Sequence, residues 1–381
     1  MSFEDRKKFF YSVSILVGTI VGVGIFGIPF SFAKAGFMLG LLFLVLVGIL
    51  SLTLNLIFGE VVLRTKSSHQ FTGYAGIYLN KGAKILASFA WFLSIYGALL
   101  AYIIISGSFL FNLFISQFYV EPSIYSIWFF VFVSLAVLAG LKTVAQFELF
   151  MVFFFMLITF FIFIFGFPRI DPKNLATLFN PEFWFLPYGV LLFAYTGFSA
   201  IPTQKELVKE KAHILKKAIL WGSLIPAVLY LVFAVSVVGI SGDTTSPDVV
   251  SGLIEFIDYK VIFLVSLFGL LAITTSFLAL AFALVQTFRL DYGFRRFHAW
   301  VLAVFVPFIL FLFGVRNFIE VISLAGSVAI GLSGVILVSM YKAAKRSGNR
   351  EPEYSLNLKP WVLNLIVILF AVAAVYALLF N

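Results

Sequence analysis

The sequence predicts an all-α polytopic membrane protein whose helices form two inverted repeats of five. Of its 381 residues, 62% are hydrophobic and 11% are charged, which is more apolar surface than a soluble fold can bury. Apolar segments of the length that spans a bilayer recur along the whole chain. Two of these segments, an odd number of spans apart, share the same interruption by glycine and proline. These observations together favour the inverted-repeat prediction.

Eleven segments are predicted as membrane spans, and short separators join them. They cover residues 9–32, 37–62, 85–111, 123–140, 147–167, 185–203, 214–240, 260–287, 297–314, 319–341 and 360–380. No separator is long enough to form a soluble domain. We therefore expect one transmembrane domain over residues 1–381, with repeat one at about 9–167, repeat two at about 185–341 and an extra helix at 360–380.

The distribution of positive charge predicts the orientation of these spans. With the N-terminus in the cytoplasm, 21 of the 26 lysines and arginines fall in cytoplasmic segments, as the positive-inside rule requires. One span more or fewer would exchange the sides of every later loop, so the asymmetry also supports eleven spans. We expect a cell (inner) membrane protein with a cytoplasmic N-terminus and with Asn381 outside. The net charge of +9 then needs no nucleic-acid partner.

Residues 18–29, with the sequence GTIVGVGIFGIP, are predicted to form a helix that is broken near its middle. Glycine costs about 1 kcal/mol relative to alanine inside a helix, and proline removes a backbone donor. In a bilayer, freed backbone groups are tolerated only beside a cavity that protein lines. We therefore expect residues 22–27 to be unwound and to face a ligand. The alternative is that Gly18 and Gly22 only permit close helix packing, which leaves Pro29 unexplained.

The sixth predicted span repeats this pattern. Residues 24–29 and 197–202 both read Gly-x-x-small-Ile-Pro, and the five spans between them reverse the orientation of the second copy. Two broken helices at corresponding positions of inverted halves are typical of secondary transporters. Residues 22–27 also match the dinucleotide-binding fingerprint GxGxxG. However, no strand precedes them and residues 41–48 contain no acid, so we reject that interpretation.

Four stretches resemble helices of a known family. Residues 18–36, 58–65, 193–202 and 274–284 are similar to the first, second, sixth and eighth helices of the amino acid/auxin permease family. The aromatic amino acid permeases are close relatives within the amino acid–polyamine–organocation superfamily. The resemblance implies a LeuT-type 5+5 fold with discontinuous helices 1 and 6 plus an eleventh helix, and it implies amino acid transport. Thr203 and Gln204 stand where related proteins carry Glu after the Ile-Pro of helix 6.

The two breaks supply the groups that a zwitterionic amino acid needs. Backbone N–H groups at the start of a half-helix suit a carboxylate, and we assign this role to Gly22, Val23, Gly24 and Ile25. The resemblance places carbonyl oxygens for the ammonium group near residues 18–21 and 193–195, which include Ala194.

The break in the sixth span is also expected to shape the substrate side-chain pocket. Phe193, Tyr195 and Phe198 would line it, and Gly197 would let the backbone turn. No charged residue is placed to pair with a charged substrate side chain. We therefore favour a neutral amino acid, with a lean toward a large apolar or aromatic one.

Either Na⁺ or H⁺ is expected as the coupling ion, and we expect no other cofactor. A sodium site is suggested by the carbonyls of Gly18 and Val21 with the hydroxyls of Thr274, Thr275 and Ser276, although such hydroxyls often bond to their own helix. The candidates for proton coupling are Glu60 and Glu148, because an acid inside a membrane is a functional candidate by default. Arg64, four residues after Glu60, offers a structural ion pair instead. Glu148 begins a span, where an acid is favourable on its own.

The sequence thus predicts a secondary active amino acid transporter, an ion-coupled symporter that works by alternating access. An amino acid exchanger, or a ligand-binding channel or sensor of the same fold, remains an alternative. We do not expect an enzyme, because the spans lack cysteine, metal-ligand clusters and paired carboxylates. The expected partners are the amino acid and the lipid bilayer, with no nucleic acid. The sequence does not predict an oligomeric state.

Overall fold

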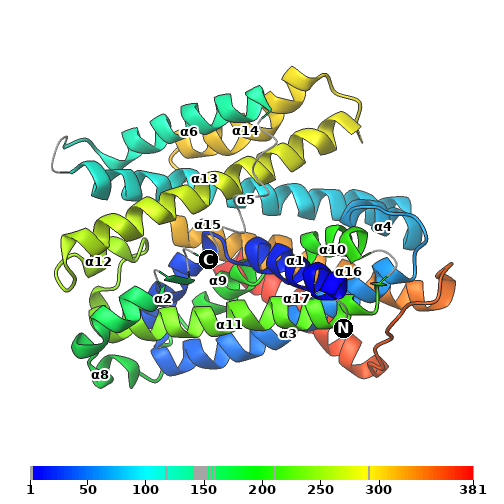
Figure 1. The fold of residues 1–381 in the computed structure, drawn as a ribbon, viewed down its shortest axis with the longest axis horizontal. Helices are drawn as coiled ribbons and strands as arrows, with labels where there is room; N and C mark the ends of the chain where they lie inside the picture. The colour runs from blue at the N-terminus through cyan, green and yellow to red at the C-terminus, as the bar shows by residue number, and fades with distance from the viewer. Residues whose placement is uncertain are drawn as a thin grey trace.

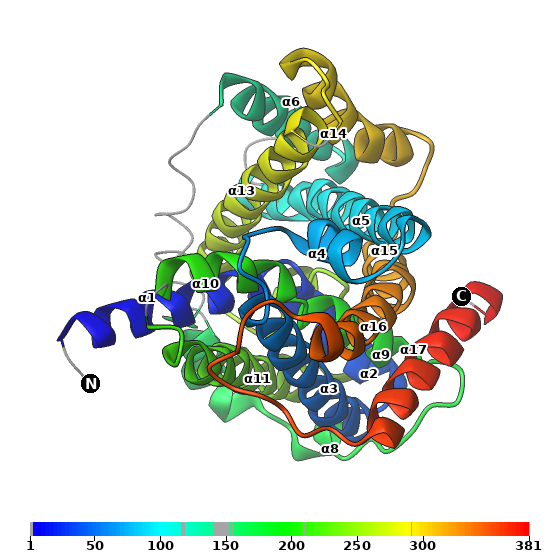
Figure 2. The same cartoon turned by 90° about the vertical axis from the view of Figure 1, so that its right-hand side faces the viewer.

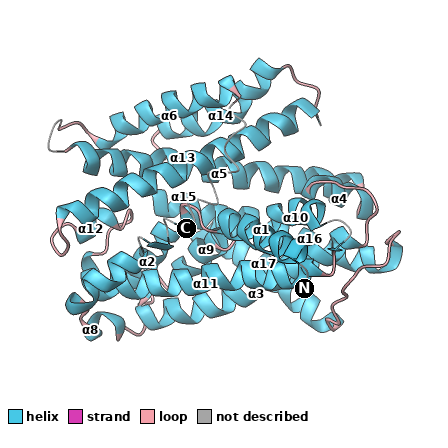
Figure 3. Cartoon of the chain, in the orientation of Figure 1, coloured by secondary structure: helices cyan, strands magenta, loops and turns pink. Residues whose placement is uncertain are grey.

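The computed structural model describes residues 3–115, 119–140, 153, 156–157, 159–208, 211–290 and 292–380. This part of the chain is mostly helical and contains no strand (Figure 3). The long helices run roughly along the longest axis of the molecule (Figure 1). Helix α3 (Phe37–Leu63) shows why these helices suit lipid, because Leu42, Leu46 and Ile49 are each more than half exposed on its outer side.

Seven described helices are long and apolar enough to cross a bilayer, and the bent pair α1 (Phe3–Ile20) and α2 (Gly24–Ala35) makes an eighth candidate. The seven are α3, α5 (Lys81–Phe114), α6 (Pro122–Ala139), α11 (Ile214–Ser241) with the turn that follows it, α13 (Tyr259–Leu290), the continuous stretch Phe318–Ser347 and α17 (Pro360–Phe380). The protein is therefore a multi-pass membrane protein.

Three of the eleven predicted spans are not among these eight. Helix α14 (Arg296–Leu312) is apolar but has only 17 residues. The predicted span 147–167 lies partly outside the described residues. Its last part belongs to a short apolar helix, Thr159–Arg169. The predicted span 185–203 is divided into α9 (Leu186–Ala194), the 3-10 turn η2 (Phe198–Ala200) and α10 (Ile201–Val208). The total of eleven spans stays a prediction.

The long helices form two neighbouring groups, which Figure 2 shows along the helix axes. One group contains α5, α6, α13 and α14, and the other contains α1–α3 and α9–α11. Helix α15 (Phe318–Leu324), the π-helical turn η5 (Ala325–Ile330) and α16 (Gly331–Ser347) contact both groups, while α17 packs on α16.

Short elements close the two ends of the molecule. Helix α4 (Phe71–Tyr78) lies at the right-hand end in Figure 1. The helices α8 (Pro172–Leu175) and α12 (Val250–Leu253) lie at the opposite end. The remaining short turns are η1 (Phe167–Arg169) and η4 (Gly242–Thr244).

The first helix is broken, as predicted, but the break is shorter than predicted. Helix α1 ends at Ile20, α2 begins at Gly24, and the two helices meet at an angle of 54°. The unwound residues are therefore 21–23 rather than 22–27. Pro29 lies inside α2, where it is buried. Helix α2 therefore continues through Pro29, and the hydrogen bond lost with the missing N–H does not end it.

The second break lies beside the first. Residues 195–197 separate α9 from η2, and Pro202 is the second residue of α10, a position where its missing N–H costs nothing. A Cβ atom added to Gly24 would lie 2.7 Å from the Cα atom of Ala194, so the start of α2 packs directly on the end of α9. The π-helical turn η5 packs as closely on α9, because a Cβ atom at Gly326 would overlap the carbonyl group of Gly189.

Candidate functional site

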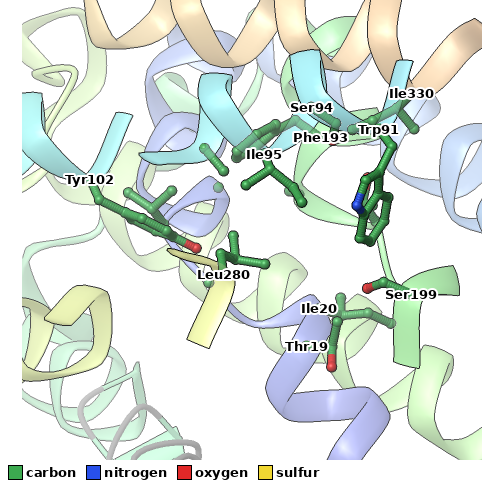
Figure 4. Close-up of a pocket in the computed structure, with 16 residues that line it drawn as sticks. Thr19, Ile20, Trp91, Ser94, Ile95, Tyr102, Phe193, Ser199, Leu280 and Ile330 are labelled. Atoms are coloured by element: carbon green, nitrogen blue, oxygen red, sulfur yellow. The ribbon is translucent and has the colours of Figure 1, made fainter. Parts of the chain in front are cut away.

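A cavity of about 80 Å³ lies where the two breaks meet α5, α13 and η5 (Figure 4). The first break contributes Thr19, Ile20, Gly22, Val23 and Gly24, and the second contributes Phe193, Ala194, Thr196 and Ser199. The rest of the wall consists of Trp91, Ser94, Ile95, Ala98 and Tyr102 from α5, Leu280 from α13 and Ile330 from η5. Trp91 and Tyr102 lie on opposite sides of the cavity in Figure 4. All sixteen side chains are uncharged.

Two of the four backbone N–H groups that we assigned to a carboxylate are available for one. The N–H of Gly22 donates to the carbonyl of Ile20 at 2.9 Å, and the N–H of Ile25 donates to Gly22 at 3.3 Å. The N–H of Val23 has no backbone acceptor among the described residues outside the helices, and Gly24 is the first residue of α2, where an N–H has no partner within its own helix. Both residues line the cavity at the N-terminus of α2, where the helix dipole favours an anion.

The residues predicted for the side-chain pocket separate into two sets. Phe193 and Ala194 line the cavity, whereas Tyr195, Gly197 and Phe198 do not, and neither does Ile25. Tyr195 packs edge-on against Tyr230 with ring centroids 5.2 Å apart. The backbone at Gly197 packs against the side chain of Ile20.

Phe198 belongs to an aromatic cluster that also contains Phe58, Phe71 and Trp91. Its ring centroid lies 5.3 Å from that of Phe71, 6.3 Å from that of Phe58 and 6.3 Å from that of Trp91. Only 3% of Phe198 is exposed. The turn after α9 directs this ring between α3, α4 and α5. Phe198 therefore packs against Trp91, which lines the cavity, and does not line the cavity itself.

The sequence reasoning missed the contribution of α5. Trp91, Ser94, Ile95, Ala98 and Tyr102 recur at the three- and four-residue spacing of one helix face. This helix is apolar on all sides, and Phe89 and Leu93 on another face are exposed. Ser94 and Tyr102 were the polar signal for the cavity-facing side, but other polar residues of α5, such as Ser88 and Tyr96, lie off the cavity and weaken it.

A second, larger cavity of about 940 Å³ joins the first and extends toward the end of the molecule where α4 lies. We call it the vestibule. It shares Thr19, Trp91, Tyr102, Ser199 and Leu280 with the smaller cavity. Its other residues come from α1 between its middle and its C-terminal end, from α4 and the residue before it, from η2 and α10, and from the last half of α13: Tyr11, Ser14, Ile15, Gly18, Gln70, Phe71, Thr72, Ala200, Thr203, Ser276, Ala279, Ala283, Gln286 and Thr287.

The predicted sodium ligands are only partly gathered. Gly18 and Ser276 both border the vestibule, and Val21 lies at the first break. The hydroxyls of Thr274 and Thr275 donate to carbonyls of their own helix, at 2.6 Å and 2.9 Å respectively. Among the residues that the structure describes, no group of three or more His, Cys, Asp or Glu is placed to hold a metal ion.

Glu60 lies outside both cavities. Its side chain is fully buried and accepts hydrogen bonds from Arg64 Nε at 2.9 Å, from Ser355 Oγ at 3.0 Å and from the backbone N–H of Leu356 at 2.6 Å. The predicted structural pairing with Arg64 is therefore present, and Glu60 lines neither cavity. The other proton-coupling candidate, Glu148, lies outside the described residues.

Helix α10 makes polar contacts with the residue that follows α3 and with α1. Lys205 lies beyond the predicted sixth span, and its ammonium group donates to the carbonyl of Thr65 at 2.8 Å. Burial, with a contribution from Arg350, lowers the pKa of Lys205. In α10 itself, Gln204 is fully buried and its Nε2 atom donates to the carbonyl of Ser12 at 2.7 Å. Gln204, one of the two residues that follow the Ile-Pro of the second break, thus joins α10 to α1.

Two broken helices that meet at a central cavity define a LeuT-type fold, the class of protein predicted from the sequence. The solved structure of MhsT in complex with L-phenylalanine is similar to the chain with a TM-score of 0.67 and 15% sequence identity, over 97% of this chain and 98% of MhsT. Residues 5–378 match the model of the tryptophan/tyrosine permease family, so the chain belongs to this family. The amino acid/auxin permease family named from the sequence is therefore wrong, although the likeness to aromatic amino acid permeases agrees with this result.

Two curated relatives are similar over nearly their whole lengths. Glutamine transporter 2 of Aliivibrio fischeri is 24% identical, over 92% of this chain and 93% of the relative. The tyrosine-specific transport system 1 of Haemophilus influenzae is 26% identical, over 96% of this chain and 94% of the relative. Both are transporters and neither is an enzyme.

Proposed function

We propose that this protein is a secondary active transporter of a neutral amino acid. The observation that carries the proposal is the N-terminus of α2 at Val23 and Gly24, which lines a cavity with no charged side chain. Its N–H groups and the dipole of α2 suit the carboxylate that every amino acid carries. Carbonyl oxygens near the two breaks suit its ammonium group. A charged substrate side chain would find no partner in this wall.

The relatives are consistent with a neutral substrate. They are named for glutamine and for tyrosine, and the similar solved structure contains phenylalanine. Trp91, Phe193 and Ile330 give this cavity apolar surface on the sides that Figure 4 shows, and Ser94 and Ser199 add hydroxyl groups. This wall favours a large apolar or aromatic side chain over a charged one.

The vestibule supports an alternating-access mechanism and an orientation. It leads from the candidate site to the end of the molecule that holds α4, and we propose that this end is cytoplasmic because the charge distribution of the sequence places α4 there. We also propose that the two broken segments α1–α2 and α9–α10 are the corresponding helices of inverted repeats in one domain. Rocking of one helix group against the other would then expose the site to the opposite side.

The coupling ion is either Na⁺ or H⁺. Gly18 and Ser276 at the vestibule wall support a cation between α1 and α13, because a carbonyl and a hydroxyl are suitable ligands for Na⁺. An exchange mechanism, which needs no coupling ion, is the second candidate. Imposing a Na⁺ gradient and a pH gradient separately on the same vesicles distinguishes symport with either ion from exchange.

The proposal is tested by uptake into liposomes that contain the purified protein. The panel is phenylalanine, tyrosine, tryptophan, glutamine and leucine, with lysine and glutamate as charged controls. We expect saturable uptake of at least one neutral amino acid and its accumulation above equilibrium under one of the two ion gradients. We expect no uptake of lysine or glutamate. Saturable counterflow without any gradient effect would indicate the exchanger. Substrate-linked current without counterflow would indicate a channel, and binding without flux a sensor. No interaction with any amino acid would overturn the proposal.

A further inference from the structure

Tyr230 of α11 connects the two helix breaks. Its side chain is fully buried. Its hydroxyl oxygen lies 2.8 Å from the carbonyl oxygen of Ile20 and 2.9 Å from the carbonyl oxygen of Ala194. Ile20 is the last residue of α1, and Ala194 is the last residue of α9. One side chain thus serves the C-terminal ends of both half-helices.

The junction of these two ends is a place where physical chemistry favours a cation. The last carbonyl groups of a helix lack partners within the helix, and the helix dipole adds partial negative charge to them. In this molecule two such ends converge inside the bundle. Unwound carbonyls and half-helix C-termini of this kind coordinate monovalent ions in membrane transporters.

The two threonine hydroxyls at the breaks do not take this place. The hydroxyl of Thr19 donates to Ile15 at 2.8 Å, and the hydroxyl of Thr196 donates to Leu192 at 2.8 Å, so both are used by their own helices. The N–H of Gly22 also donates to Ile20, at 2.9 Å, and the hydroxyl of Tyr230 is a side-chain donor that joins the two breaks. The ring of Tyr195 packs against that of Tyr230 and holds it in position.

We propose that Tyr230 is a positioning residue whose neutral hydroxyl occupies the place of a monovalent cation at the junction of the two breaks. The phenol proton takes the role that a bound ion would have, since it is shared between two carbonyl oxygens. The wild-type junction therefore binds no cation, and a coupling ion, if the transporter uses one, binds elsewhere. The effect on transport rests on the proposed function, whereas the effect on cation binding does not.

The first test measures cation binding without any amino acid. The variants are Tyr230→Phe, which removes only the hydroxyl, and Tyr230→Asn, which supplies an amide oxygen as a cation ligand. The matched control is Tyr188→Phe, because the hydroxyl of Tyr188 is buried without a hydrogen-bond partner. The thermal unfolding midpoint of each detergent-solubilised protein is measured in NaCl, LiCl and KCl against choline chloride at constant ionic strength.

We expect both Tyr230 variants to unfold at a lower temperature than the wild type in choline chloride. Na⁺ or Li⁺ should restore part of the loss in a saturable manner, because a ligand stabilises the state that it binds. The wild type and Tyr188→Phe should share one smaller response or none. The proposal would be overturned if the cations changed the unfolding midpoints of both Tyr230 variants by no more than they change that of the wild type. Variants that fail to fold with and without these cations would also overturn it.

A second test measures the Michaelis constant of uptake for a transported neutral amino acid. In choline chloride, Tyr230→Phe should raise KM by about tenfold, the effect of one lost hydrogen bond in a buried site. Na⁺ or Li⁺ should lower this KM by a larger factor than in the wild type. A purely structural role would give the same cation dependence as the wild type and would count against the proposal. Wild-type protein without any uptake would instead refute the proposed function, and the first test would still decide the role of Tyr230.

Discussion

The carboxylate of Glu60 accepts a hydrogen bond of 2.6 Å from the backbone N–H of Leu356, which lies in the linker between α16 and α17. This linker, residues 348–359, crosses the end of α3. The hydroxyl of Tyr354 donates to the carbonyl of Leu56 at 2.7 Å, and the N–H groups of Asn349 and Arg350 donate to the carbonyl of Arg64. The buried carboxylate of Glu60 on α3 thus holds the linker 348–359 against the end of α3 by hydrogen bonds.

Replacing Glu60 by Gln should destabilise the protein without altering how uptake depends on pH. Removing one partner of a buried ion pair costs about 3–5 kcal/mol, because Arg64 keeps a charge that nothing offsets. The unfolding midpoint in detergent measures the loss. Uptake by the surviving protein should keep the wild-type pH profile, because Glu60 borders neither cavity. A profile that becomes flat would show that Glu60 carries the coupling proton.

The matched control for this variant is Glu353→Gln. Glu353 pairs with Arg350 in the same linker, but both side chains are partly exposed. A surface pair of this kind contributes about 0–1 kcal/mol, so the unfolding midpoint should change little. Equal losses for Glu60→Gln and Glu353→Gln would contradict the special position of the buried pair.

Alanine at Gly24 should abolish uptake, whereas alanine at Gly22 should be tolerated. A Cβ atom at Gly24 would lie 2.7 Å from the backbone of Ala194, so α2 and α9 would have to separate. A Cβ atom at Gly22 would meet only the hydroxyl of Tyr102, at an ordinary contact distance of 3.5 Å. Initial uptake rates, normalised to the amount of folded protein, compare the two variants. The reverse order would show that the two breaks are not packed as described.

The two phenylalanines after the second break should differ in what they control. Phe198→Ala should lower stability by about 3–5 kcal/mol, as for other buried aromatic residues, and change relative substrate preference little. Phe193→Ala should raise the KM for large substrates while lowering stability less, because Phe193 lines the cavity and is only partly buried. Competition by a panel of amino acids measures preference. If Phe198→Ala changed the ranking of substrates, its ring would have to reach the cavity.

Single cysteines should reveal the vestibule, since the chain contains no cysteine of its own. In inside-out vesicles, a membrane-impermeant thiol reagent should label Thr203→Cys and Gln286→Cys, because both positions line the vestibule. Ser236→Cys on α11 is the control and should not react, because Ser236 is fully buried. Labelling of the first two only from the opposite side would reverse the proposed orientation.

The helix breaks could be predicted to within a few residues because glycine and proline act locally. The length of the first break could not, since α2 continues through Pro29 among the helices packed around it. The pairing of Glu60 with Arg64 followed from their spacing of four residues on one helix. The contact between Glu60 and Leu356 joins distant parts of the chain, so no local sequence pattern could predict it.

The side chains that line the cavity were harder to predict from the sequence than the backbone breaks. In a soluble helix an apolar stripe marks the buried side, but in a membrane span the sides that face lipid and protein are both apolar. Phe89 and Trp91 are neighbouring aromatic residues of α5, yet only Trp91 reaches the cavity. For the same reason Phe198 was assigned to the pocket, although it packs behind the wall.

The π-helical turn at Ala325–Ile330 has an evolutionary consequence. A π-turn contains one residue more than the α-helical turn that it replaces. Deleting a single codon there, such as that of Gly326, would let this turn return to α-helical geometry, while the later residues of the helix keep their orientation relative to α15. The turn can thus absorb the loss of one residue without moving the helix that follows it. Homologous genes should therefore differ by one codon here more readily than within the regular turns of α15 and α16.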